Sequence, residues 1–366
     1  MSKAAELANL IGNINAGSPL AERNLVHNGA MLVSQRGSSA ITLSGLTPNI
    51  DRFTAFKSND GTQTVEQSTD GPEGFKNSLK VTNTSADSSV AAGDRVAIIY
   101  RCEGQHISHL EWGTANAKTC TLSFYVKSSI TGTHGGAFGN GSDNRAYPFT
   151  YTISSANTWE RKIITVEGDT SGTWAIDNTR SLQICWGLGV GSTNSGTADA
   201  WESADRNSAT GATTDFLTTA NATWFLTGVQ LEIGQNATAF EHEPFERTLA
   251  KCQRYFQKIE SLGSVGSYNA FPYTGLSRTS TIGKVSLGWI TQLRASPTIT
   301  TTAANTFAIV NGSASAIACT SVSAGRTNSN SAVIEFTVSS GLTVGQATYL
   351  TTNNATDPAI SVDSEL

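Results

Sequence analysis

Three tryptophans lie outside the alternating patterns of the chain and could take part in ligand binding. Trp201 lies in a long loop among charged residues, Trp174 lies in a turn-like stretch, and Trp112 follows a strand-like run. Flat aromatic rings stack on the apolar C–H patches of a pyranose, while amides and carboxylates beside them fix its hydroxyls. Sugar binding is therefore the chemistry that these three residues could perform. Packing in a core or an interface is the alternative for each of them.

Metal-binding patterns are weak in this sequence. His106 and His109, with Glu111 close by, form the tightest cluster of possible ligands among the five histidines. A transition-metal site normally needs three or four convergent groups held by further hydrogen bonds. The five cysteines lie far apart without a CxxC motif, so we expect small buried side chains rather than a metal site or disulfides. We predict no metal centre.

Catalytic patterns are also weak. Glycoside hydrolysis needs a pair of carboxylates at a fixed separation. Glu241 and Glu243 flank a histidine, and Asp169 and Asp177 bracket a turn, but nothing in the sequence fixes the separation of either pair. No GxSxG, Walker or GxGxxG motif stands in a fitting context. We therefore expect a protein without enzymatic activity and keep a polysaccharide depolymerase as an alternative.

Composition narrows the fold and the function class. Of the 366 residues 42 are Ser and 48 are Thr, whereas only 14% are charged. Hydroxyl-rich, charge-poor chains suit β-sheets with polar loops rather than helical bundles. The net charge of −5, with no cluster of Lys and Arg, argues against a nucleic-acid partner. No apolar run reaches the roughly 18 residues of a membrane span, so we expect no membrane insertion.

The first segment, residues 1–23, is predicted to begin with a short helix. Ser2 can cap this helix, and an apolar stripe follows at helical spacing, formed by Leu7, Leu10, Ile11 and Ile14. The stripe has nothing in its own segment to pack against. It therefore needs a partner, either the rest of this chain or another protein.

Residues 24–243 are predicted to form a β-sandwich or jelly roll. Short alternating runs are separated by clusters of Gly, Asn, Ser, Thr and Asp, as in Arg95–Cys102, Cys120–Lys127 and Ser181–Leu188. About eight to ten such strands fit an all-β domain of two packed sheets.

Residues 244–262 change to a helical period. Pro244 could begin a helix, and an apolar seam follows at spacings of four, three and four residues, formed by Phe245, Leu249, Cys252 and Phe256, with Ile259 next. Such a short helix is marginal alone. We leave two interpretations open: the helix packs on copies of itself around a symmetry axis, or it links two domains.

Residues 263–366 are predicted to form a second β-rich domain. Alternation returns, and after Arg294 the charged residues are only Arg326, Glu335, Asp357, Asp363 and Glu365. Burial of this charge-poor surface between copies of the chain would explain the depletion.

Several segments together resemble phage tail-fibre and other virion appendage proteins. Their opening has the pattern N-L-hydrophobic-x-N-G-x-M, then Q-R-G and D-R-W. Here it is matched by Asn24-Leu25-Val26-His27-Asn28-Gly29-Ala30-Met31, Gln35-Arg36-Gly37 and Asp51-Arg52-Phe53. A closing G-V-Q-L-E-I-G pattern matches 228–234, residues 249–256 resemble the E-L-x-x-C-Q-R-Y-Y helix that follows it in these proteins, and the terminal strand pattern matches 361–366. Phe53 stands where these proteins usually have Trp, which keeps the packing role.

The resemblance implies a non-catalytic virion protein with a jelly-roll module that resembles carbohydrate-binding domains. It implies a homotrimer that binds host cell-surface polysaccharide and joins other virion proteins through residues 1–23, at the tail or a portal-proximal adaptor rather than the capsid. Related jelly rolls often hold a structural Ca²⁺ near their first and last strands. Glu232 is the one weak candidate here, because the adjacent Asp pair of such sites is missing.

Two other functions remain open besides a glycan-binding tail fibre. One is a capsid fibre or decoration protein, in which the jelly roll only packs. The other is the polysaccharide depolymerase considered above.

Overall fold

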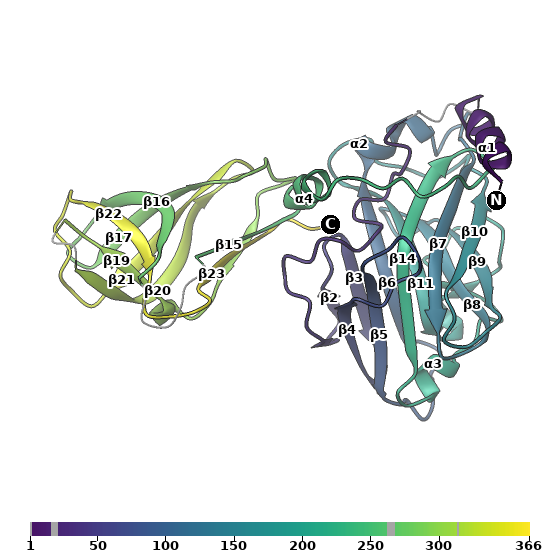
Figure 1. The fold of residues 1–366 in the computed structure, drawn as a ribbon, viewed down its shortest axis with the longest axis horizontal. Coiled ribbons are helices and arrows are strands. Elements are labelled where there is room, and N and C mark those ends of the chain that lie inside the picture. The colour runs from purple at the N-terminus through teal and green to yellow at the C-terminus, as the bar shows by residue number, and fades with distance from the viewer. Residues whose placement is uncertain (1, 16–20, 262–267, 313–314) are drawn as a thin grey trace. The chain divides into compact units, whose positions relative to one another are not determined.

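The structure is a computed structural model that describes residues 2–15, 21–261, 268–312 and 315–366. The chain divides into two compact units, Met1–Leu249 together with Leu366, and Ala250–Glu365. Both units are built mainly from antiparallel sheets, with a few short helices (Figure 1). The predicted all-β fold, a sandwich followed by a second β domain, is confirmed.

The first unit is a sandwich of two six-stranded sheets. One sheet has the order β1 (Ile41–Thr42), β4 (Thr62–Ser68), β5 (Ser78–Ser85), β14 (Thr223–Ile233), β7 (Cys120–Ser128), β10 (Glu160–Val166). The other has the order β2 (Leu46–Pro48), β3 (Phe53–Ser58), β6 (Arg95–Glu103), β11 (Arg180–Val190), β8 (Gly132–Asn140), β9 (Ala146–Ile153). We call them the β14 sheet and the β11 sheet. Short elements lie between these strands along the chain: α2 (Gly104–Ile107), η1 (Ser108–Leu110), η2 (Ser192–Asn194), β12 (Ser195–Gly196), β13 (Ser208–Ala209) and α3 (Asp215–Thr218).

The core of the sandwich lies between the two sheets, where the alternating runs of the sequence predicted it. Strand β7 turns Leu122 and Phe124 inward, and β11 turns Ile184 and Trp186 inward, all of them fully buried. Period-two alternation places these side chains on one face of each strand, so the opposite faces of both sheets point outward.

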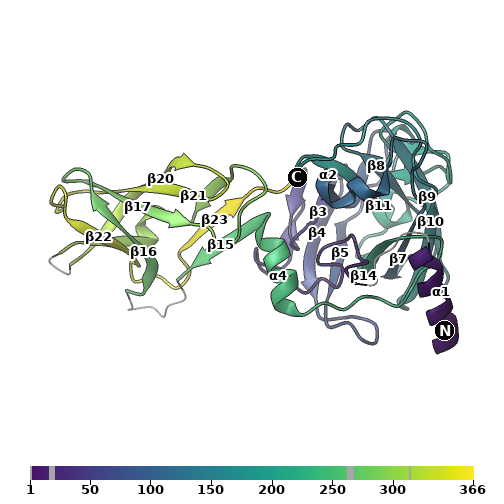
Figure 2. The ribbon, with the colours of Figure 1, turned by 90° about the horizontal axis from the view of Figure 1, so that it is seen from above.

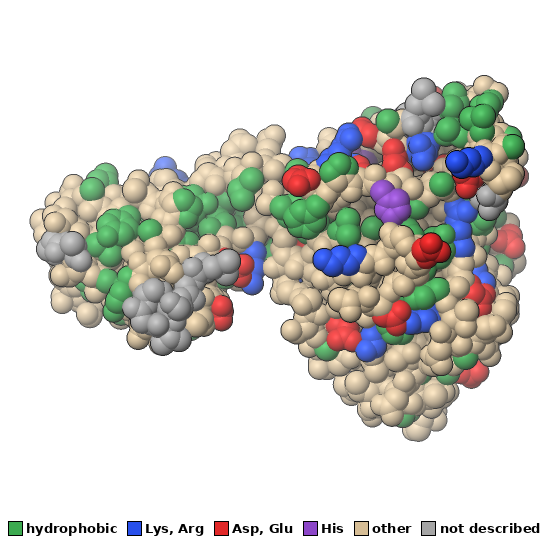
Figure 3. All heavy atoms as spheres, viewed as in Figure 1, with side chains coloured by type: hydrophobic (Ala, Val, Ile, Leu, Met, Phe, Trp, Pro, Cys, Tyr) green, Lys and Arg blue, Asp and Glu red, His purple; other side chains and the backbone are tan. Residues whose placement is uncertain are grey.

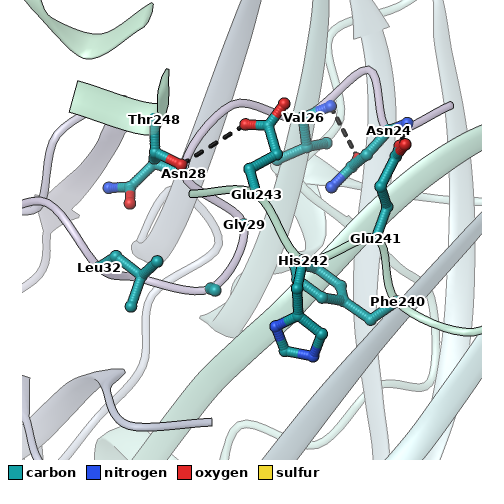
Figure 4. Close-up of a pocket in the computed structure, with 11 residues that line it drawn as sticks. Asn24, Val26, Asn28, Gly29, Leu32, Phe240, Glu241, His242, Glu243 and Thr248 are labelled. Carbon is teal, nitrogen blue, oxygen red and sulfur yellow. Dashed lines mark hydrogen bonds between the residues drawn. The ribbon is translucent and has the colours of Figure 1, made fainter. Parts of the chain in front are cut away.

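Asparagine side chains fix the N-terminal end of the sandwich. The Asn24 side chain donates to the Val229 carbonyl at 3.0 Å and accepts from the amide of Leu231 at 3.1 Å. It also accepts from the amide of Val26 at 2.9 Å (Figure 4). Asn28 has φ +60° and bonds both backbone groups of Val33. Asn tolerates this left-handed conformation better than most residues. The asparagines of the opening motif are therefore structural.

The N-terminal helix α1 (Lys3–Asn15) is attached to the sandwich by a polar residue. The Asn13 side chain is fully buried and donates to Glu232 at 3.2 Å and to the Asn236 carbonyl at 2.7 Å. Figures 1 and 2 show α1 beside the end of the β14 sheet that contains β7 and β10. Ser2 caps the helix as predicted, through its hydroxyl and the Ala5 amide. The apolar stripe stays accessible: Leu7 and Ile11 are about half exposed, and Leu10 and Ile14 are partly exposed.

The predicted helix 244–262 is wrong in its second half. Helix α4 covers Phe245–Gln253, and a turn then leads into strand β15 (Phe256–Glu260). Phe256 and Ile259 therefore lie on a strand, which pairs along its whole length with β23 (Ala359–Asp363). That pairing bridges about a hundred residues of sequence, so a local periodicity could not reveal it.

The predicted trimer seam of Phe245, Leu249, Cys252 and Phe256 therefore does not lie on a single helix. Cys252 and Phe256 are buried in the single chain, whereas Phe245 is half exposed and Leu249 is partly exposed. Only these last two of the four seam residues remain available to another chain.

The second unit contains a closed six-stranded barrel and a small sheet. The barrel has the order β16 (Ala270–Ser277), β17 (Ile282–Gly288), β21 (Ser331–Val338), β20 (Ala316–Thr327), β19 (Phe307–Val310), β22 (Ala347–Thr352). The sheet has the order β15, β23, β18 (Thr298–Thr301), and the turn η3 (Ala304–Thr306) precedes β19. Phe307, Phe336 and Leu350 are fully buried in the core of this unit.

Candidate functional site

The strongest candidate site is a groove on the outer face of the β11 sheet. Its floor is apolar, formed by Phe56 on β3 and by Ala97 and Ile99 on β6. Arginines, aspartates and amides surround this floor: Arg95, Arg101, Asp143, Arg180, Gln183, Asp205 and Asn207. The groove encloses about 210 Å³. A polar rim over an apolar floor is the usual construction of a small-ligand site.

The arginine at one end of the groove is held in place by four groups. Arg95 donates to the side-chain oxygens of Asn207 at 2.5 Å and Asn194 at 3.3 Å, and it lies 3.7 Å from the Asp205 carboxylate. Its guanidinium carbon stands 4.5 Å from the centre of the Phe56 ring, a cation–π contact. The Arg95 head is thus oriented before any ligand arrives.

Gln183 organises the other end. Its side-chain oxygen accepts from Arg101 at 3.2 Å and from Arg180 at 3.4 Å. Arg180 also donates to the carboxylate of Asp143 at 2.5 Å, in the turn between β8 and β9. Donors and acceptors therefore alternate along the rim, which suits a ligand that carries many hydroxyl groups.

The surroundings of Asp205 raise the pKa of its carboxyl group. Burial raises its pKa, and the neighbouring Asp143 carboxylate raises it further, while Arg95 and Arg180 act in the opposite direction.

The sequence reasoning missed this groove, although the signal was present. The run Arg95–Cys102 places Val96, Ile98, Tyr100 and Cys102 in the core, so the residues that alternate with them must face outward. Two arginines on that outward face of an otherwise charge-poor chain were the available evidence.

The three predicted tryptophans lie together, away from the groove floor. The rings of Trp112 and Trp174 are perpendicular at 84°, with centres 4.8 Å apart, and Trp201 stands edge-on to both at 5.5 and 5.7 Å. Trp112 and Trp174 are buried in the core, and Trp201 packs against it while its indole donates to the Glu167 carbonyl at 2.8 Å. Edge-to-face contacts among the three indole rings therefore bury part of each ring. Trp112 and Trp174 also line a second pocket, near η1.

The predicted acidic pairs have structural partners. Glu241 accepts the backbone amides of Glu22 and Asn24 at 2.8 and 3.0 Å. Figure 4 shows its carboxylate and the His242 ring pointing to opposite sides. The cavity between them and the N-terminal segment is about 20 Å³, the size of one water.

The second predicted pair, Asp169 and Asp177, also has structural partners. Asp169 forms an ion pair with Arg145, and Asp177 accepts a hydrogen bond from the Thr179 hydroxyl.

Glu232 is fully buried, and its carboxylate is saturated with hydrogen bonds. It accepts from Asn13, from Gln230 at 3.0 Å, and from the amide and hydroxyl of Thr238, both at 2.8 Å. A calcium ion at Glu232 would have to displace these donors. Over the described ranges no group of three or more His, Cys, Asp or Glu is placed to hold a metal ion.

The five cysteines are buried, as predicted, and none of them forms a disulfide within the described residues. None of the helices in the described part of the chain is long and apolar enough to cross a membrane.

On the face shown in Figure 3, acidic and basic side chains are interspersed among polar ones.

Comparison with known proteins gives likeness of fold only. No protein-family profile and no curated protein matches the sequence. Part of this chain is similar to the enzymatically active domain of tailspike protein 4 of bacteriophage CBA120, with 15% identity over 58% of this chain and a TM-score of 0.32. This chain spans about a fifth of that tailspike, with 21% of it covered.

Carbohydrate-binding modules are similar in the same way. The family 11 module of Clostridium thermocellum, solved with a mixed-linked tetrasaccharide, has 10% identity, covers 56% of this chain and 99% of its own, and gives a TM-score of 0.27. The CBM22-1 xylan-binding domain of Paenibacillus barcinonensis has 10% identity and a TM-score of 0.24. The match covers 55% of this chain and 98% of that domain.

Proposed function

We propose that this chain binds polysaccharide, without cleaving it, through the groove on the β11 sheet. The observation that carries the proposal is the pre-arranged rim of Arg95, Gln183 and Arg180 above an apolar floor. Sugars present both hydroxyl edges and apolar C–H faces, and the groove offers a partner for each.

The biological setting that we propose is a phage virion, in a tail fibre or similar appendage that attaches to host surface glycans. The motif resemblance supports this setting. The exposed stripe of Leu7 and Ile11 on α1 would join other virion proteins, and Phe245 and Leu249 would contribute to a homotrimer. Several weak sites on one particle would then act together through effective concentration.

Binding can be tested by the retardation of the full chain in gels that contain soluble polysaccharides. We expect at least one polysaccharide to retard the protein, and Arg180→Gln and Asp205→Asn to remove the retardation. Lys80→Gln, on the outer face of the β14 sheet, is the matched control and should behave as the wild type. Equal retardation of the groove variants, or none with any polysaccharide, contradicts the proposal.

Release of reducing sugar from a retained polysaccharide tests the catalytic alternative. If the wild type releases it and Asp205→Asn does not, the chain is a depolymerase. The trimer is tested by light scattering: we expect three times the chain mass for the wild type and the chain mass for Phe245→Asp.

A further inference from the structure

A second pocket lies at the end of the sandwich, between η1 and the segment before β11. It encloses about 250 Å³, enough for one sugar residue, and Trp112 and Trp174 form its apolar wall together with Ile107 and Ile176. Ile176 is 74% exposed, an unusual position for a large aliphatic side chain beside a buried aromatic pair.

The two indoles present carbon rather than N–H groups to this pocket. The Trp112 nitrogen donates to the Lys118 carbonyl at 2.8 Å, and the Trp174 nitrogen donates to Asp169 at 3.2 Å. Because the rings are perpendicular, they form an apolar corner. A methyl group fits such a corner, whereas a hydroxyl would lose its hydrogen bonds there.

Polar groups with unused capacity complete the pocket. Within the described residues, the carboxylate of Glu111 and the side-chain amide of Asn116, which are both exposed, make no hydrogen bond or ion pair. The hydroxyl of Ser181 is fully buried and also lacks a partner in the described structure. Because this hydroxyl has no accessible surface, a ligand in the pocket cannot reach it, and Glu111 and Asn116 are the polar side chains that the pocket offers.

We propose that this pocket binds a single N-acylated sugar residue. The acyl methyl would lie in the corner of Trp112 and Trp174, the amide N–H would donate to Glu111, and a ring hydroxyl would bond Asn116. The inference rests on the proposed function, because the pocket would take a residue of the same surface polysaccharide. Arg180 lines the groove and its neighbour Ser181 lines the pocket, so the two sites meet on one strand.

The test uses the full chain labelled with 5-fluorotryptophan and observed by ¹⁹F NMR. The probes are the methyl glycosides of N-acetylglucosamine, glucosamine and glucose. We expect the N-acetylated sugar to shift the resonances of Trp112 and Trp174, which Trp→Phe variants assign. Binding of the other two glycosides should be about fivefold weaker, because both lack the acyl methyl contact, although the amine or hydroxyl that they carry at the same carbon can still donate to Glu111. Equal binding of glucose, or preference for glucosamine, overturns the proposed ligand class.

Exposed variants keep the test independent of folding. Glu111→Gln and Ile176→Ala should weaken the response about fivefold. Glu73→Gln and Ile163→Ala, at exposed positions elsewhere on the sandwich, are the matched controls and should leave it unchanged. An unchanged response in the pocket variants overturns the inference.

The groove variant separates this inference from the proposed function. Arg180→Gln should lose polysaccharide retention and keep the N-acetylglucosaminide response. If the wild type retains polysaccharide but no glycoside shifts any tryptophan, this inference fails and the groove proposal stands. If neither signal appears, both fail.

Discussion

Arg145 holds Asp169 through two parallel hydrogen bonds, from Nε to Oδ2 at 2.8 Å and from Nη2 to Oδ1 at 2.6 Å. Asp169 also accepts the indole N–H of Trp174, and the Arg145 guanidinium lies 5.9 Å from the centre of the Trp201 ring. One ion pair thus positions two of the three clustered tryptophans. Bidentate pairs of this kind fix direction as well as distance.

Asp169→Asn should destabilise the sandwich by about 3 kcal/mol, because it leaves a largely buried guanidinium without its counter-charge. Six of the seven tryptophans belong to the first unit, so their fluorescence during urea unfolding reports this unit. Asp177→Asn is the control, and equal midpoints for the two variants would contradict the assignment.

The same ion pair makes the stability depend on pH. Burial raises the pKa of Asp169, but the bonds from Arg145, Ser171 and Trp174 together lower it. Its stabilisation is therefore present above the usual aspartate pKa and lost as the pH falls through the lowered value.

His134 should make the stability depend on pH in the weakly acidic range. Burial lowers its pKa, although its bond to the Ile130 carbonyl at 3.1 Å and the charge of Asp215 act in the opposite direction. The unfolded chain then takes up a proton that the folded chain refuses, so the free energy of unfolding should fall as the pH decreases below about 6.5. His134→Gln should flatten this slope, and His242→Gln, at an exposed site, should keep it. Unfolding curves between pH 5 and pH 7.5 measure the difference, and parallel slopes would exclude His134 as a source.

Gly228 is required where β14 changes its register against β7. It has φ +60°, and an added Cβ would lie 2.8 Å from atoms of both the Phe75 and Tyr125 rings. Gly228→Ala should cost about 1–3 kcal/mol for the backbone, and more for displacing the rings. Gly45→Ala isolates the first contribution, since Gly45 has the same φ and open space around it. Thermal unfolding of both variants gives the comparison, and equal losses would mean that the ring contacts do not matter.

Asn13→Ala should release α1 while the sandwich stays folded. The variant removes the bonds to Glu232 and Asn236, each of which contributes about 1 kcal/mol. Hydrogen exchange of residues 3–15 should become at least about tenfold faster, with β14 unchanged. Leu7→Ala, on the exposed side, should leave the exchange rate of the helix unchanged. Slow exchange in the Asn13 variant would show that other contacts hold α1.

The fold was predictable from the sequence where burial alternates strictly with position. Leu122 and Phe124 on β7, and Ile184 and Trp186 on β11, occupy the core positions that the pattern indicates. The helix over 244–262 failed because Phe256 and Ile259 satisfy a helical spacing locally, while their backbone pairs with β23. The apolar spacing carried no information about that distant partner.

The candidate site was less predictable because it depends on contacts across strands. The sequence marks Trp112, Trp174 and Trp201 as unusual, but not that their rings pack against one another. It also contains Arg95 and Arg180, but Gln183 and Asn207 orient them only once β6, β11 and a distant loop meet. The glycan-binding role of the tryptophans and the trimeric state stay predictions.

The buried cysteines allow the unfolding of each unit to be followed separately through the reactivity of their thiols. Burial raises the pKa of Cys102, Cys185 and Cys319 to about 12 in each case, so almost no reactive thiolate exists at neutral pH while the chain is folded. Cys102 and Cys185 belong to the first unit and Cys319 to the second. Pulse alkylation followed by peptide mass analysis would therefore time the opening of the sandwich and of the barrel separately in one intact chain.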